Sequence, residues 1–223
     1  MAETTQERWT RGSARELRFW GKWIAGDGQL LAYTGANRIP EFIAKHIPRQ
    51  VNLSRPRVRI ADLGAGAWSH VGTYLPGIDV EIVASDIFAE EYMAHWRSQT
   101  AQPLVAIEKQ DMTALTYPDD SFDIVHCSNA LDHTTNPFAA IAEMKRICKP
   151  GGWILLRHQN SVGIGNHYTG LHLWNITPED EDLRIWSDHE QEHGYLSALL
   201  PGVTMSILSA KPKRLAEWRK PSA

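Results

Sequence analysis

The chain has few of the features that mark secreted, membrane-spanning or nucleic-acid-binding proteins. Its 223 residues include two cysteines, Cys127 and Cys148, which are too few for a disulfide framework. No run approaches the roughly 20 apolar residues that span a bilayer, and the polar start, Met1 to Arg8, has no apolar signal region. We therefore expect a soluble, cytoplasmic protein with no membrane partner.

The chain also lacks an excess of positive charge. Its formal net charge of −3 at pH 7 gives no electrostatic reason to expect a nucleic-acid partner. Only the end, Lys211 to Lys220, is locally basic, and a solvated terminal helix explains this segment better than a binding patch does. We expect a small-molecule substrate and leave homodimer formation open.

The chain does have enough length and hydrophobic content, at 43%, for one large domain with a real core. Alternating strands and helices predict an α/β fold: a mostly parallel, seven-stranded sheet with right-handed crossovers and helices on both faces. The predicted strands are at about 57–62, 79–85, 104–108, 122–127, 153–157, 183–187 and 203–209. The predicted helices begin near residue 14 and near 137, and cover about 38–47, 88–97 and 190–199, with a helical turn at Thr177 to Asp180.

Two parts of the chain are distinguished by these patterns. Residues 1–50 are predicted to form an N-terminal helical extension that acts as a lid, and residues 51–223 to form the main domain. A capping box, Ser13-x-x-Glu16, sets the predicted start of the first helix.

The most informative stretch runs from Val58 to Trp68. An apolar strand ends at Asp62 and breaks into the turn Gly64-Ala65-Gly66, and a second apolar run ends at Asp86, 20 residues beyond Gly66. Glycines let the backbone approach a ligand, and an acid at the end of the second strand accepts hydrogen bonds from ribose hydroxyls. The pattern predicts a site for a ribonucleoside.

The third glycine of the dinucleotide-binding pattern is missing. Ser69 stands at its position, and the bulky Trp68 would crowd a pyrophosphate. A cofactor with one ribose and no pyrophosphate therefore fits better than a nicotinamide dinucleotide, which disfavours an oxidoreductase.

Over residues 57–157 the chain resembles the class I S-adenosylmethionine-dependent methyltransferases, particularly the small-molecule group. The matching segments are Asp62-Leu63-Gly64-Ala65-Gly66, Asp86, Gln110-Asp111-Met112, Asp120 to Val125, and Arg146 to Gly152. Each segment is weak alone, and their common order makes the resemblance strong. It implies a Rossmann-like fold, S-adenosyl-L-methionine as cofactor, and methyl transfer as the reaction.

The resemblance assigns residues to the methionine end of the cofactor. It implies that the turn at Gly64 and Gly66 approaches the methionine part, and that Asp62 helps to hold its ammonium group, directly or through water. The loop that starts at Asn129 would lie beside this ammonium and the reactive methyl group. Members of the family often have glycine where this chain has Trp68, so we expect that side chain to shape the methionine end.

The resemblance also assigns the nucleoside end. Asp86 would take both ribose hydroxyls, with Ile87 beside it. Asp111 would accept a hydrogen bond from the adenine amino group, and Met112 would offer its backbone N–H to the ring.

Histidines are the candidate catalytic groups. A hydroxyl acceptor usually needs a base, and histidine is the usual base near neutral pH. His133 follows the fourth predicted strand and is expected over the reactive methyl group, so it is the first candidate base. His158, at the end of the fifth predicted strand, is the second. His167 and His172 lie in the irregular stretch 163–175 and are expected to contact substrate.

A metal site built from these four histidines and Asp132 is an alternative, because imidazole and carboxylate suit several divalent metals. No tight ligand spacing supports it, so the sequence predicts no metal.

The sequence allows two interpretations of the first helix. Trp20 and Trp23 either belong to the core or wall an apolar substrate pocket that excludes water. The expected function is methyl transfer to a small molecule, with oxygen preferred as the accepting atom. The alternatives are an N- or C-methyltransferase, and a cofactor-binding protein that does not transfer methyl groups and acts as another kind of catalyst or as a scaffold.

Overall fold

The computed structural model describes residues 3–26, 38–47, 57–100, 102–190, 193–207 and 213–222, so the predicted boundary between residues 50 and 51 lies outside it. The helices are α1 (Thr5–Ala25), α2 (Glu41–Ala44), α3 (Ala89–Trp96), α4 (Pro137–Ile147), α5 (Val162–Gly165) and α6 (Leu196–Leu199), with a 3-10 helix, η2 (Leu131–His133). The strands are β1 (Val58–Leu63), β2 (Val80–Asp86), β3 (Ile107–Lys109), β4 (Phe122–Ser128), β5 (Cys148–Gln159), β6 (Asn175–Glu179), β7 (Asp182–Trp186), β8 (Gly194–Tyr195), β9 (Thr204–Ile207) and β10 (Lys213–Arg219).

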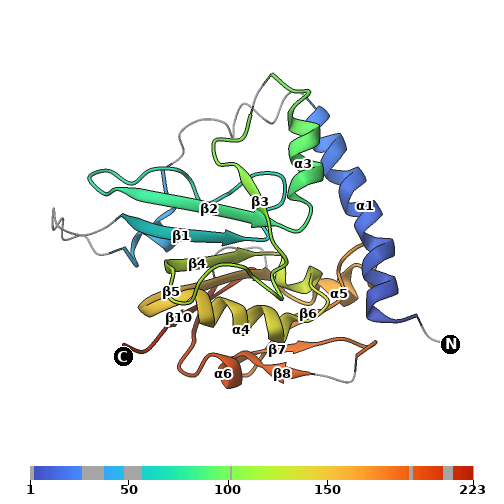
Figure 1. Cartoon of the computed structure of the whole chain (residues 1–223). Coiled ribbons are helices and arrows are strands. Elements are labelled where there is room, and N and C mark those ends of the chain that lie inside the picture. Colours follow the sequence, from blue (N-terminus) through green and yellow to red (C-terminus); the bar gives the residue numbers. More distant parts are fainter. Residues whose placement is uncertain are drawn as a thin grey trace.

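A seven-stranded sheet lies at the centre of the fold, in the order β3-β2-β1-β4-β5-β10-β9 (Figure 1). The first five strands pair in parallel, and β10 is antiparallel to both of its neighbours. This arrangement confirms the predicted Rossmann-like, mostly parallel sheet. It also brings the carboxyl ends of β1 to β4 to one edge, where sheets of this kind bind their ligands.

One strand of the central sheet is not the one predicted. The segment predicted at 183–187 corresponds to β7, which belongs to a separate three-stranded antiparallel sheet with β6 and β8. In the central sheet, the strand beside β5 is instead β10, which comes from the basic segment that was predicted to be a helix. That helix prediction is wrong, because pairing of Lys213 to Arg219 with β5 outweighs the helix propensity of the local sequence.

The C-terminal helical predictions fail in two further places. Thr177 to Asp180, expected to form a helical turn, falls largely within strand β6. The helix expected around 190–199 is only the single turn α6, which follows the short strand β8. Both segments join the small sheet, so tertiary pairing again decides their conformation.

The first helix begins about two and a half turns earlier than predicted. Thr4 caps it, with its side chain accepting from the Glu7 backbone N–H while the Glu7 carboxylate accepts from the Thr4 N–H. Ser13 lies inside the helix, and its hydroxyl donates to the Trp9 carbonyl. The sequence holds two boxes of the same form, and the upstream one is the cap because the helix runs unbroken through the second.

Both faces of the central sheet are covered by helices, as predicted. Residues that alternate along β1 belong to different clusters: Ala61 and Leu63 pack with Ile141 of α4, and Ile60 packs with Ile43 of α2. Because successive side chains of β1 point to opposite faces of the sheet, this strand packs against helices on both faces.

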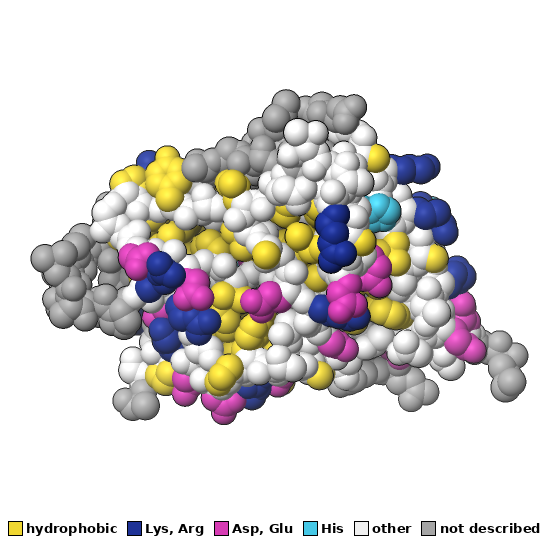
Figure 2. Space-filling model, turned by 45° about the horizontal axis from the view of Figure 1, so that its top comes forward, with side chains coloured by type: hydrophobic (Ala, Val, Ile, Leu, Met, Phe, Trp, Pro, Cys, Tyr) yellow, Lys and Arg dark blue, Asp and Glu magenta, His cyan; other side chains and the backbone are white. Residues whose placement is uncertain are grey.

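In the part of the chain that the structure describes, no helix has both the length and the apolar character needed to cross a membrane. On the face shown in Figure 2, basic and acidic side chains are interspersed with hydrophobic ones.

Candidate active site

A cavity of about 180 Å³ opens at the carboxyl ends of β1 to β4. Gly64 lines it from the end of β1, Asp86 and Ile87 from the end of β2, and Asp111 and Met112 from the loop after β3. This is the edge of the sheet at which the sequence places the cofactor. The structure thus brings together five of the residues assigned to cofactor binding.

The charge of the cavity suits a cationic ligand. Its lining includes the carboxylates of Glu16, Asp86 and Asp111, and no Lys or Arg is among the described residues that line it. The sulfonium and ammonium groups of S-adenosylmethionine are positive, so carboxylates favour this cofactor electrostatically.

Asp86 connects the ends of two strands. Its Oδ2 accepts from the Gly66 backbone N–H at 3.0 Å, and its Oδ1 accepts from the Phe88 N–H at 2.9 Å. Burial raises the pKa of Asp86, although these two hydrogen bonds oppose the increase. An ionised carboxylate offers about four acceptor positions, so about two remain for the hydroxyls of a ribose.

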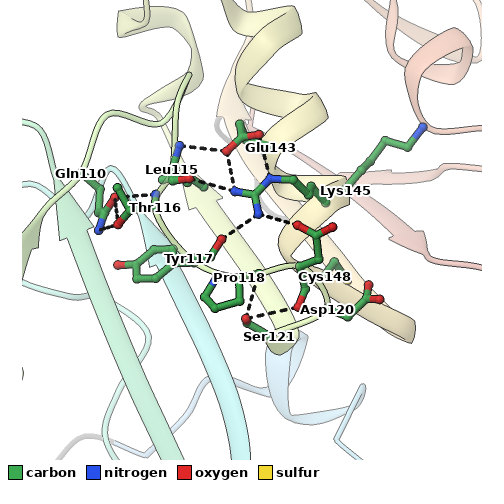
Figure 3. Close-up of polar contacts among 12 residues, drawn as sticks. Gln110, Leu115, Thr116, Tyr117, Pro118, Asp120, Ser121, Glu143, Lys145 and Cys148 are labelled. Carbon is green, nitrogen blue, oxygen red and sulfur yellow. Dashed lines mark hydrogen bonds and ion pairs between the residues drawn. The ribbon is translucent and has the colours of Figure 1, made fainter.

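The loop that carries Asp111 and Met112 is held from α4. Glu143 accepts from the Leu115 backbone N–H at 2.8 Å, and Arg146 donates to the Leu115 carbonyl at 2.9 Å (Figure 3). Arg146 also donates to the carbonyl of Tyr117. Arg146 belongs to the segment that resembles the family, but that resemblance does not predict this role; the three-residue spacing of Glu143 and Arg146 on a helix is the signal that indicates their pairing.

The same loop closes on itself through Gln110 and Thr116 (Figure 3). The Gln110 side chain accepts from the Thr116 backbone N–H at 3.1 Å and donates to its hydroxyl at 2.8 Å. The Asp111 carboxylate accepts from the Thr113 backbone N–H and hydroxyl. These contacts fix the turn in which Asp111 and Met112 face the cavity.

Asp62 lies behind the cavity, among buried polar groups. Its Oδ1 lies 2.7 Å from His126 Nδ1, and its Oδ2 accepts from the Ser69 hydroxyl at 2.7 Å. Burial by itself raises the pKa of Asp62, but the contact with His126 and the Ser69 hydrogen bond bring it below its ordinary value. In this structure Asp62 therefore ties β1 to β4 and to the segment after the glycine turn.

Trp68 also lies outside the cavity lining. Its ring, 7% exposed, packs edge-on against Trp20, with centroids 5.1 Å apart, and against Trp23 at 6.0 Å. Trp20 also covers Gly66, where an added Cβ would meet the indole at 2.9 Å. Trp20 and Trp23 thus connect α1 to the segment of the glycine turn, and both pack against the ring of Trp68.

α1 lies beside α3 (Figure 1), and two further residues, Trp9 and Arg8, hold its start in place. Trp9 lines the cavity, stacks on Phe88 and donates from Nε1 to the His133 carbonyl at 3.1 Å. Arg8, which is buried, pairs with Glu190 at 2.6 Å. The aromatic and charged residues at the start of α1 gave no sequence signal that distinguished them from an exposed helix end.

The loop after β4 completes the cavity. His133 lines it, and the backbone of Asn129 is left-handed, with φ of 51°. The Asn129 side chain accepts from the Gln159 backbone N–H at 3.0 Å. Asn129 therefore shapes the turn from which Ala130 and His133 reach the cavity.

His133 belongs to a cluster of polar side chains. Its Nε2 lies 3.2 Å from His172 Nδ1, which lies 2.9 Å from Asp132 Oδ2. Burial lowers the pKa of His172, but the hydrogen bond and charge of Asp132 outweigh it, so this pKa is raised. The chain brings these residues together from η2 and from the irregular stretch before β6.

His172 is not among the residues that line the cavity, and neither are the other two candidate histidines. Burial lowers the pKa of His158 to about 4, and its Nδ1 lies 4.0 Å from Asp132 Oδ1. His167 is exposed in a turn with a left-handed backbone. His158 is thus behind the cluster, whereas His167 is on the surface.

Comparison with known proteins agrees with this geometry. Residues 61–156 match the family model described as a methyltransferase domain. Phosphoethanolamine N-methyltransferase 1 of Zea mays is 26% identical over 205 residues, which cover 88% of this chain and 38% of that protein. The ubiquinone/menaquinone biosynthesis C-methyltransferase UbiE of Shewanella oneidensis is 30% identical over 112 residues, covering 48% of this chain and 45% of that protein. The chain spans less than half the length of either relative.

A solved structure supports the fold over nearly the whole chain. A chain from the complex that contains the Haloferax volcanii Trm112 methyltransferase activator aligns with 94% of this chain and 97% of its own length. The TM-score is 0.52 at 16% sequence identity, so the likeness concerns the fold alone. Together, the sheet order, the motifs at its carboxyl edge and the family match over residues 61–156 support a class I S-adenosylmethionine-dependent methyltransferase domain in this chain.

Proposed function

We propose that this protein transfers a methyl group from S-adenosylmethionine to an oxygen of a small-molecule acceptor. The observation that carries the proposal is the placement of Asp86 and His133 in one acid-lined cavity. S-adenosylmethionine supplies a methyl group on a positively charged sulfur, so the reaction mainly requires that the acceptor be positioned and in its reactive protonation state.

Different residues in and around the cavity bind different parts of the cofactor. The remaining acceptor positions of Asp86 bind the ribose hydroxyls, while Asp111 and the backbone of Met112 receive the adenine ring beside Ile87. Gly64 and Gly66 allow close approach of the methionine part, with Asp62 and Asn129 supporting the surrounding loops. Trp68 acts on this end through α1, because Trp20 and Trp23 pack against it.

His133 is the proposed base that removes the proton from the acceptor hydroxyl. Its side chain is 22% exposed and lines the cavity, so the imidazole is placed to accept the hydroxyl proton as a base. His158 is buried beside Asp132 and supports the cluster from behind. His172 orients His133, and His167 contacts only acceptors that reach the surface turn.

Replacing the imidazole tests this assignment. His133→Ala should lower turnover by about 10²- to 10⁴-fold, the usual contribution of a general base. Binding of S-adenosylmethionine, measured by calorimetry, should stay within about two-fold, because the nucleoside contacts remain. Unchanged turnover in this variant would remove His133 from the reaction.

An amine is the second candidate acceptor, because the maize relative is named as an N-methyltransferase. A neutral amine needs no base, so amine methylation should survive in His133→Ala. A panel of hydroxyl and amine acceptors, incubated with methyl-labelled cofactor, separates the two. Cofactor binding without label transfer to any acceptor, including those in a cell extract, would favour the scaffold alternative.

We further propose that the protein acts in the cytoplasm, on small molecules rather than nucleic acids, and that any self-association is a homodimer. The net charge of −3 supports the choice of substrate class. Sedimentation of the purified protein tests the dimer.

A further inference from the structure

Three side chains with metal-binding atoms converge beside the cavity, and one of them, His133, lines it. Asp132 Oδ2 lies 2.9 Å from His172 Nδ1 and 3.5 Å from His133 Nε2. The two histidine nitrogens lie 3.2 Å apart. The three atoms therefore form a compact triangle, with each member facing the other two.

Hydrogen bonding does not account for all three sides of this triangle. A neutral imidazole has one N–H, and the hydrogen on His172 Nδ1 cannot point fully at both Asp132 and His133. By contrast, atoms that bind one metal ion at about 2.1 Å lie roughly 3.0 to 3.4 Å from one another in octahedral or tetrahedral geometry. All three observed separations are close to this range.

The charge of the cluster also calls for a cation. Asp132 is 1% exposed, and its ion-pair contacts among the described residues are all to histidines: His133, His158 and His172. A buried carboxylate is costly unless a positive charge compensates it, and a cation bound between the three side chains would supply that charge.

Unpartnered atoms next to the triangle give a second, independent observation. Asp132 Oδ1 and both ring nitrogens of His158 are buried and have no hydrogen-bond partner in the described part of the chain. His158 Nδ1 and Asp132 Oδ1 lie 4.0 Å apart, so the unmet polar atoms face each other beneath the cluster. Buried polar groups left in this state usually mark an ion or water that completes the site.

We infer that Asp132, His133 and His172 bind a first-row divalent cation at the acceptor end of the cavity. Two imidazoles and one carboxylate on one side of an ion leave coordination positions open on the other. Because His133 lines the cavity, those positions face the space proposed for the acceptor. The ligand chemistry selects an acceptor with two neighbouring oxygens, one of which is the hydroxyl that is methylated.

The inference rests on the proposed oxygen methylation and changes the role of one residue. With the ion bound, His133 is a ligand, and the ion stabilises the ionised oxygen in place of a free imidazole base. The hydroxyl proton leaves to solvent, the new O–C bond forms, and the S–C bond breaks with its electron pair retained by sulfur. No oxidant or reductant is required.

Cobalt titration tests the site without reference to turnover. The full chain, stripped with EDTA, is titrated with Co²⁺ alone and followed by calorimetry and by visible absorption of the bound ion. We expect one equivalent to bind with the absorption of a nitrogen- and oxygen-ligated ion, and His133→Ala and His172→Ala each to weaken binding at least ten-fold. The matched control is His95→Ala, an exposed histidine on α3, which should bind Co²⁺ as the unmodified chain does.

Each result has a defined meaning. Absence of Co²⁺ binding by the stripped, folded chain, or equal binding by His172→Ala, overturns the inference. Binding of S-adenosylmethionine is measured on the same stripped sample: if it persists while Co²⁺ fails to bind, only the metal site is rejected. If Co²⁺ binds and the cofactor does not, the proposed methyl transfer fails while the metal site stands.

Discussion

Asp86 Oδ2 accepts a 3.0 Å hydrogen bond from the backbone N–H of Gly66, so the acid that ends β2 is attached to the glycine turn that follows β1. The glycine turn and the acid at the end of the second strand, which together predict the nucleoside site, are thus hydrogen-bonded to each other. Movement of either one displaces the other.

Asp86→Asn is expected to weaken S-adenosylmethionine binding strongly. The amide keeps one acceptor oxygen, so the contacts with Gly66, Phe88 and the ribose cannot all be made. Losing hydrogen bonds to a charged group costs about 1.5–3 kcal/mol each, which corresponds to roughly ten-fold or more in affinity. Calorimetry measures the change, with Glu90→Gln, an exposed carboxylate on α3, as control. Equal affinity for Asp86→Asn and the unmodified chain would contradict the ribose assignment.

Arg146→Gln is expected to loosen the loop from Gln110 to Tyr117. The variant loses the hydrogen bonds to the carbonyls of Leu115 and Tyr117, so backbone amides in this loop should exchange faster and KM for the cofactor should rise. The rate at saturating cofactor should change little, because Arg146 does not line the cavity. Lys145→Gln is the matched control, because Lys145 donates to the Leu199 carbonyl and extends away from the loop (Figure 3). A fall in kcat with KM unchanged would contradict this positioning role.

Trp68→Ala is expected to release α1. Deleting a large buried aromatic side chain costs about 3–5 kcal/mol, and the indole removed here is the one that receives Trp20 and Trp23. Thermal unfolding should begin at a lower temperature, and hydrogen exchange along α1 should accelerate before that of the central sheet. Trp186→Ala, in the small sheet, is the control: it should leave exchange along α1 as it is. The prediction fails if α1 is equally protected with and without Trp68.

Glu143→Gln is expected to reduce stability in a pH-dependent way. The hydrogen bond from Arg146 lowers the pKa of Glu143 below its ordinary value of 4.5, although burial opposes the change. A carboxyl group with a lowered pKa stabilises the fold above its ordinary pKa, and this contribution is lost as the pH falls through the lowered value. The Tm difference between the unmodified chain and the variant should therefore be full near about pH 7 and shrink below about pH 4. A difference that is the same at both pH values would show that charge is not responsible.

The central fold and the cofactor side of the cavity were predictable because their signals are local. A strand, its terminal acid and the glycine turn lie next to one another in sequence, and parallel pairing brings Asp86 and Asp111 to the same edge. The basic segment at the end of the chain was not predictable in this way. Its residues favour a helix, and only its two antiparallel partners make it a strand.

The acceptor side depends on contacts between distant parts of the chain. His172 lies in a stretch without periodicity, and nothing local indicates that it meets His133, 39 residues earlier. The same holds for Trp9, whose contact with the His133 carbonyl spans 124 residues. Hydrophobic periodicity describes how an element packs, not which distant loop it meets.

The pairing of Arg8 with Glu190 has a consequence for synthesis on the ribosome. These residues are 182 positions apart, so their ion pair cannot form until Glu190 has emerged. Until then α1 lacks this partner, whereas the segments that contact Trp9 and Trp20 have already emerged. Domains form from the N-terminus during translation, and contacts between distant residues form slowly. The start of α1 is therefore fixed by its ion pair later than the rest of the helix can be fixed by its aromatic contacts.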